Sequence, residues 1–115
     1  MNQESLLLEN IKEFIDEANS ALKNKHFNSA VTLFFKALAV LCDLYILREE
    51  GFIPSNHTER FQILREKHLV IYSILYKNFP IYQNSYRLKL DESYALVLKN
   101  DIRKLTKLCQ INEPI

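Results

Sequence analysis

The sequence predicts an all-α protein, a four- to five-helix up-and-down bundle. The chain has 115 residues, enough for one modest core, and 48% of them are hydrophobic. It contains only one glycine and three prolines, whereas a β-sandwich or barrel needs a turn about every 8–12 residues. Several long stretches also carry apolar residues at helical spacing. We therefore expect residues 1–115 to form a single helical domain.

The first helix is expected over about residues 4–24. Its charged side chains lie mainly opposite an apolar stripe at helical spacing. The stripe consists of Leu7, Leu8, Ile11, Phe14, Ile15, Ala18, Ala21 and Leu22. The sequence KNKHF then breaks the pattern, which indicates a turn between two helices.

A second helix is expected from residue 27 or 28 to about residue 50. It is apolar almost all round, which is typical of a helix surrounded by others. Its polar residues fall in one narrow stripe, which consists of Ser29, Thr32, Lys36, Asp43 and Glu50. Because charges are seldom buried unpaired, Lys36 and Asp43 should each find a partner on another helix, line a groove or enter a subunit contact.

Residues 53–61, IPSNHTERF, form the most polar short stretch that follows this helix. Gly51, the only glycine, suits the C-cap of the second helix. Pro54 prevents the helix from continuing. Asn56 is expected to be the N-cap of a short third helix, with Glu59 completing a variant of the capping box.

His57 and Arg60 lie three residues apart, on one face of the first turn of that short helix. Free N–H groups and the helix dipole favour an anion at such a position. Two interpretations stay open. The two side chains are either solvated or locally paired, or they contact a phosphate or carboxylate group.

Two further helices complete the predicted bundle. One spans about residues 67–78, and Pro80 ends or kinks it before a short turn, PIYQNSYR. The last runs from about Asp91, a suitable N-cap, to Gln110. Its outer face is basic and includes Lys99, Arg103, Lys104 and Lys107.

Charge is distributed unevenly along the chain. The net charge is +1, with five basic against eight acidic residues in positions 1–55 and ten against six in positions 56–115. A basic C-terminal half is compatible with an RNA or an acidic partner, and also with an ordinary solvated surface.

Tyrosines and cations alternate in that half. Aromatic rings that stack on bases, interleaved with cations for phosphates, are typical of surfaces that bind single-stranded nucleic acid. The alternative is a half-buried helix stripe with solvated hydroxyl groups, at least for Tyr72 and Tyr76. The candidate ligand-binding residues are His57, Arg60, Lys77, Tyr82, Tyr86, Arg87 and Lys89.

Other classes of function lack their motifs. One glycine cannot form a phosphate-binding loop, and no grouping of catalytic residues is visible, so we assign no catalytic residue. Cys42 and Cys109 belong to no metal-binding cluster, and we expect no metal and no cofactor. The N-terminus lacks the features of a signal peptide, and no window offers about 18 uncharged apolar residues. We expect a cytoplasmic protein that does not bind membranes.

Residues 24–64 resemble the central helical hairpin of the HEPN superfamily. The matching positions are Phe27, Ala30, Phe34, Phe35, Ala37, Leu38, Gly51, His57 and Phe61, followed by the apolar Ile63 and Leu64. Small stand-alone archaeal members are similar in two further stretches, which correspond here to Ser55–Phe61 and to Phe79, Pro80, Tyr82 and Tyr86. In helix order the resemblance extends over about residues 5–110.

The resemblance implies a helical domain that is often dimeric. Many members of the superfamily are RNases or the toxin halves of toxin–antitoxin pairs, and they work beside a small nucleotidyltransferase. The chain is thus expected to be a homodimer that binds RNA or a nucleotide, or a nucleotidyltransferase partner protein.

The nuclease motif of the superfamily, an arginine followed by a histidine after four to six residues, is not found. The next histidine lies nine positions after Arg48, eight after Arg60 and three after Arg65. No histidine follows Arg87. We therefore transfer the fold and the binding surface, and we do not transfer nuclease activity.

Two alternatives remain. Residues 21–38 match the helix-turn-helix spacing of a tetratricopeptide pair, which would make the chain a protein–protein interaction module, although no second copy recurs about 34 residues later. The other alternative is an RNase toxin with a rearranged Arg/His pair, such as His57 and Arg60.

Overall fold

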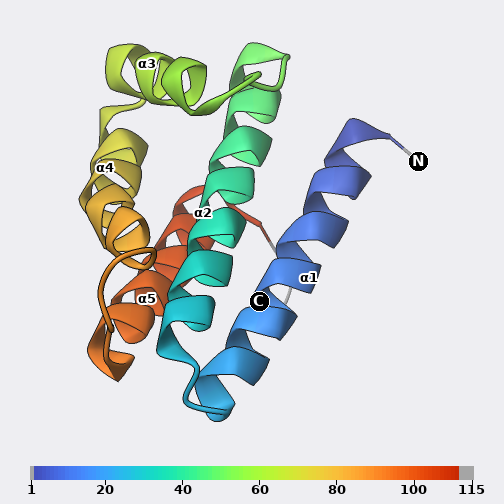
Figure 1. Cartoon of the computed structure of the whole chain (residues 1–115). Helices are drawn as coiled ribbons and strands as arrows, with labels where there is room; N and C mark the ends of the chain where they lie inside the picture. The colour runs from blue at the N-terminus through green and yellow to red at the C-terminus, as the bar shows by residue number, and fades with distance from the viewer. Residues whose placement is uncertain (1, 112–115) are drawn as a thin grey trace.

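The computed structural model describes residues 2–111, which form five α-helices and no strand. The helices are α1 (Gln3–Lys23), α2 (Phe27–Glu50), α3 (His57–Lys67), α4 (Leu69–Asn84) and α5 (Glu92–Leu108). In Figure 1, α1, α2, α4 and α5 alternate in direction, and α3 lies across one end of them. The predicted all-α helical bundle is confirmed.

Helix α2 is the centre of the bundle, because α1, α3, α4 and α5 all pack against it. Its fully buried side chains include Phe34, Phe35, Leu38 and Leu41. By length and composition α2 could cross a membrane, but 67% of its most apolar 18-residue window is buried inside the fold. Most of the apolar surface of α2 is therefore covered by the chain's own helices.

The helix ends follow the predicted signals. Gly51 has φ +88° and ends α2 with its N–H bound to the carbonyl of Leu47. Asn56 Oδ1 accepts a hydrogen bond from the N–H of Glu59, as an N-cap does. The Glu59 carboxylate accepts from the N–H of Ser55, one residue before the cap. This reciprocal pair fixes the start of α3 and hence the place of His57.

The polar stripe of α2 faces other helices and the turn after α4. Thr32 Oγ1 lies 3.0 Å from Ser85 Oγ. At the other end of the helix, Glu50 Oε2 lies 2.9 Å from His68 Nε2. Lys36, between these points, is exposed. The stripe thus positions both ends of α4 on α2, because His68 and Ser85 flank that helix.

Helix α4 corrects one prediction, because it runs through Pro80 to Asn84 rather than ending near residue 78. A proline inside a helix costs about 3 kcal/mol. Here Pro80 is exposed, whereas Phe79, Ile81 and Tyr82 pack against the core. Their burial offsets the lost hydrogen bond, and the continued helix places Tyr82 against Phe35 of α2 and in one cavity with His57.

Candidate functional site

The site begins with a buried ion pair between α2 and α3. Arg60 Nε lies 2.7 Å from Asp43 Oδ1, and Arg60 Nη2 lies 2.9 Å from Asp43 Oδ2. The exposed fractions are 8% for Arg60 and 6% for Asp43. Both carboxylate oxygens are used, so the guanidinium charge of Arg60 is neutralised inside the protein. This contact supplies the partner on another helix that Asp43 was expected to need.

The same arginine holds His57, which starts α3. Arg60 Nη1 lies 2.7 Å from His57 Nδ1. A guanidinium group has no acceptor, so Arg60 must donate and Nδ1 must carry a lone pair. The proton of the neutral ring therefore sits on Nε2. His57 and Arg60 are thus paired with each other, and Arg60 also contacts the Asp43 carboxylate.

The protonation of His57 follows from these neighbours. Partial burial of the ring lowers the pKa of His57, and the nearby Arg60 guanidinium lowers it further, while Asp43 acts in the opposite direction. Since the ordinary pKa of histidine is about 6.5, the ring is neutral at pH 7. His57 thus offers a neutral N–H donor, and it offers neither a cation nor a free base.

A cavity of about 520 Å³ opens beside His57. It is lined by His57, Phe79, Tyr82, Gln83, Asn84, Tyr86 and Arg87, and we call it the His57 cavity. Four of the seven predicted ligand-binding residues meet here. They come from the start of α3, the end of α4 and the following turn.

Two tyrosines shape this cavity in different ways. Tyr82 is half-buried and stacks on Phe35, with ring centroids 4.4 Å apart and planes at 13°. Its hydroxyl lies 2.8 Å from that of Tyr86. That hydrogen bond, with burial, raises the pKa of Tyr82 to about 12. Tyr86 is 70% exposed, so its ring is the one whose face is available to a ligand.

The other predicted residues lie elsewhere. Arg60 is buried behind His57. Lys77 Nζ lies 2.7 Å from Asp101 Oδ2 and so faces α5. Lys89 lines a separate cavity of about 230 Å³ with His26.

Sequence reasoning missed some of the residues that form the site. Phe35, Phe79, Gln83 and Asn84 were not selected, because stacking and lining depend on the packing of α2 against α4. The signal that was available for Asp43 was its acidic charge on an apolar helix. That signal predicts that Asp43 has a partner, but it does not identify the partner as Arg60, which is 17 residues away.

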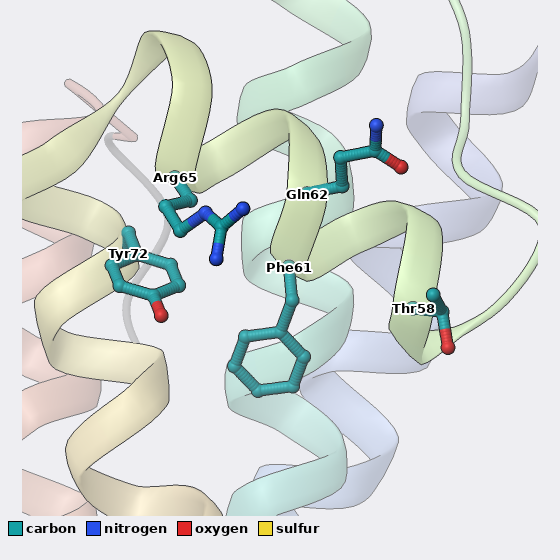
Figure 2. A pocket seen from close by; sticks show the side chains of 5 residues that line it. All are labelled: Thr58, Phe61, Gln62, Arg65 and Tyr72. Carbon is teal, nitrogen blue, oxygen red and sulfur yellow. The ribbon is translucent and has the colours of Figure 1, made fainter.

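A second cavity, of about 420 Å³, lies between α3 and the first part of α4. It is lined by Thr58, Phe61, Gln62, Arg65 and Tyr72, and we call it the Arg65 cavity. In the view of Figure 2, the guanidinium group of Arg65 lies between the rings of Tyr72 and Phe61. None of its polar residues was among the predicted site residues.

The cysteines and acidic residues add no site of their own. Within residues 2–111, no group of three or more His, Cys, Asp or Glu side chains could hold a metal ion. Cys42 and Cys109 are free and buried. Burial raises the pKa of both thiols, that of Cys109 to about 12, so both are protonated at pH 7.

No family model, no curated protein and no solved structure matches the chain.

Proposed function

We propose that the chain is a HEPN-like helical domain that binds a nucleotide or single-stranded RNA in the His57 cavity. The observation that carries this proposal is the convergence of His57, Tyr82, Tyr86 and Arg87 on one cavity of about 520 Å³. These residues come from two helices and a turn, and together they offer stacking, positive charge and a hydrogen-bond donor.

Each group has a defined task. The exposed ring of Tyr86 stacks on a base, and Tyr82 supports it through their shared hydrogen bond. Arg87 binds a phosphate with its guanidinium fork. The Nε2–H of His57 donates to a phosphate or carbonyl oxygen. The amides of Gln83 and Asn84 can both donate and accept, as the edge of a base requires.

The same geometry argues against RNA cleavage by His57 and Arg60. Metal-independent cleavage needs a base near the 2′-hydroxyl and a cation near the phosphate. Arg60 is bound to Asp43, and His57 uses its only lone pair to accept from Arg60. We expect no cleavage above background. Cleavage that disappears in both His57→Gln and the double variant Asp43→Leu/Arg60→Leu would replace this proposal with an RNase.

The resemblance adds a partner to the proposal. A nucleotidyltransferase that works beside this domain would deliver or receive the nucleotide held at the His57 cavity. Co-purification of the chain with the product of a neighbouring nucleotidyltransferase gene, lost in Arg87→Ala, would support this arrangement. Complex formation that does not depend on Arg87 would place the contact elsewhere.

Binding is tested by fluorescence anisotropy with labelled oligouridylate at several salt concentrations. Arg87→Ala should weaken binding and reduce the slope of log K against log salt by about 0.7, because one phosphate contact is lost. Lys12→Ala is the control. It removes one exposed charge from α1, which lies on the opposite side of α2 from α4. Absence of binding at low salt, or equal effects of both variants, would overturn the proposal.

A second candidate function, an interaction module, is favoured by a different surface. Leu69, Val70 and Leu108 are 63%, 66% and 49% exposed. They border a cavity of about 350 Å³ that also contains Tyr45 and His68. Monomeric proteins seldom leave such neighbouring apolar side chains uncovered. A second copy of the chain, related by two-fold symmetry, is the commonest way to cover them.

Analytical ultracentrifugation tests this dimer. The wild-type chain should sediment as a dimer at micromolar concentrations, and Val70→Asp should convert it to a monomer. Leu6→Asp, at a similarly exposed apolar position on α1, should remain dimeric. A wild-type monomer would rule out the dimer.

A further inference from the structure

The two cavities are joined by a continuous series of aromatic rings. In order, the rings are Tyr76, Tyr72, Phe61, Phe79, Tyr82 and Tyr86, which we call the aromatic row. Successive centroid distances along it are 5.4, 6.2, 5.2, 6.1 and 5.6 Å. All but Phe61 come from α4 or the turn after it, at spacings of three or four residues, and so they lie on one face.

The ends of the row are open and its middle is half-buried. Tyr76 is 61% exposed and Tyr86 is 70% exposed. Phe61 and Phe79 are partly covered and pack against the core. The row therefore has two separate places where a base can stack, one at each end.

A cation lines each of the two cavities. Arg87 lines the His57 cavity, and Arg65 lines the other. Arg65 is exposed, and within residues 2–111 no carboxylate forms an ion pair with it. In the view of Figure 2 its guanidinium group lies between the rings of Tyr72 and Phe61. A guanidinium group held beside aromatic rings can contact a phosphate while the neighbouring ring stacks on a base.

The charges around the row suit an anionic strand. Helix α4 contains no acidic residue, and Lys77 is its only charged one. On α3, the Glu59 carboxylate accepts a hydrogen bond from the N–H of Ser55. Glu66 lies 3.4 Å from the amide of Gln62. Glu66 is thus the remaining exposed acid next to Arg65, and it does not lie in the cavity.

We infer that the Arg65 cavity is a second subsite for the same single-stranded RNA. This inference rests on the proposed function of the His57 cavity and extends it from a nucleotide to a strand. Tyr72 and Tyr82 are ten residues apart on α4, which is about 15 Å along the helix, and Tyr86 lies beyond the end of α4. A dinucleotide cannot reach both cavities, whereas a decanucleotide can.

The experiment compares a labelled uridine dinucleotide with a decauridylate on the full chain. Arg65→Ala should weaken decauridylate binding by roughly fivefold, as expected for one exposed charge contact, and reduce its salt slope by about 0.7. It should leave dinucleotide binding unchanged. Arg87→Ala should weaken binding of both ligands, and Lys12→Ala should weaken neither.

The possible failures have different signatures. If Arg87→Ala weakens both ligands while Arg65→Ala weakens neither, the second subsite is wrong and the proposed function stands. If the wild-type chain binds neither ligand, both are wrong. If a polyglutamate peptide binds as well as decauridylate, the surface recognises acidic protein, and the inference of an RNA strand is overturned.

Discussion

Arg60 and Arg65 lie five residues apart on the same short helix, yet they belong to opposite kinds of region. Arg60 is buried, and Asp43 binds it with both oxygens. Arg65 is exposed beside aromatic rings, without a carboxylate partner in residues 2–111. The difference shows that the helix facing an arginine determines whether that arginine is paired with an acid. Helix α2 presents an acid to Arg60, whereas α4 presents only rings and no acid to Arg65.

Substitutions in the two regions should change different measured quantities, namely stability in one and ligand binding in the other. The Asp43–Arg60–His57 network joins α2 to α3 and should control stability. The aromatic row and its two exposed arginines should control binding with little effect on stability. A variant of the network that changes only binding, or a variant of the aromatic row that changes only stability, would contradict these separate roles.

The largest effect is expected from breaking the buried ion pair. Asp43→Ala leaves the Arg60 guanidinium buried without its counter-charge, which typically costs about 3–5 kcal/mol. Arg60→Ala should cost a similar amount for the same reason. Urea denaturation followed by circular dichroism measures the loss.

The double variant Asp43→Leu/Arg60→Leu provides the matched control. Replacing both partners of a buried pair with apolar side chains is often neutral or stabilising. The double variant should therefore be markedly more stable than either single variant. If the three variants are equally stable, the ion pair does not join α2 to α3 in the way described.

The next effect concerns the opposite region. Tyr86→Ala should weaken decauridylate binding by about 1–3 kcal/mol, the usual contribution of one stacked base, and leave the salt slope unchanged. Because its exposed ring makes few contacts with the core, the urea midpoint of unfolding should stay nearly constant. Tyr82→Ala should lower both affinity and stability, because Tyr82 also stacks on Phe35. Equal behaviour of the two variants would contradict the separate roles.

Much of the fold is local in origin, and local signals predicted it. Helical spacing located α1 and α2, and the positive φ of Gly51 and the cap at Asn56 were both expected from residue type. The path of α4 through Pro80 was missed, because it depends on the burial of Phe79 and Tyr82 by other helices. Tertiary packing there outweighed the intrinsic cost of proline.

The same error explains why Lys77 was grouped with the tyrosines of the candidate site. A helix that continues through Pro80 puts Lys77 and Tyr82 about 140° apart, since they differ by five residues at 100° each. With the helix ending near residue 78, the two side chains seemed free to converge. Arg65 was overlooked for a related reason, because its value as a site residue depends on Tyr72 from the next helix.

A smaller effect tests how His57 is held in place. Asn56→Ala removes the side chain that accepts from the N–H of Glu59, and it should destabilise the protein by about 1 kcal/mol. Binding should weaken slightly, because the first turn of α3 carries His57. The cap variant Asn56→Asp should retain stability. A loss as large as that of Asp43→Ala would show that the start of α3 depends on more than its cap.

The smallest effect is a dependence of stability on pH that is due to His57. Burial and Arg60 lower the folded-state pKa of His57 below its ordinary value of about 6.5, so the unfolded chain binds more protons there. This contribution is complete above about pH 6.5, is lost as the pH falls below that value, and levels off below the folded-state pKa. Asp43, Arg60 and Arg87 are the charged groups that face the ring or its cavity. His57→Gln should therefore flatten the pH dependence of unfolding between pH 5 and 7, and an unchanged slope would show that another group causes it.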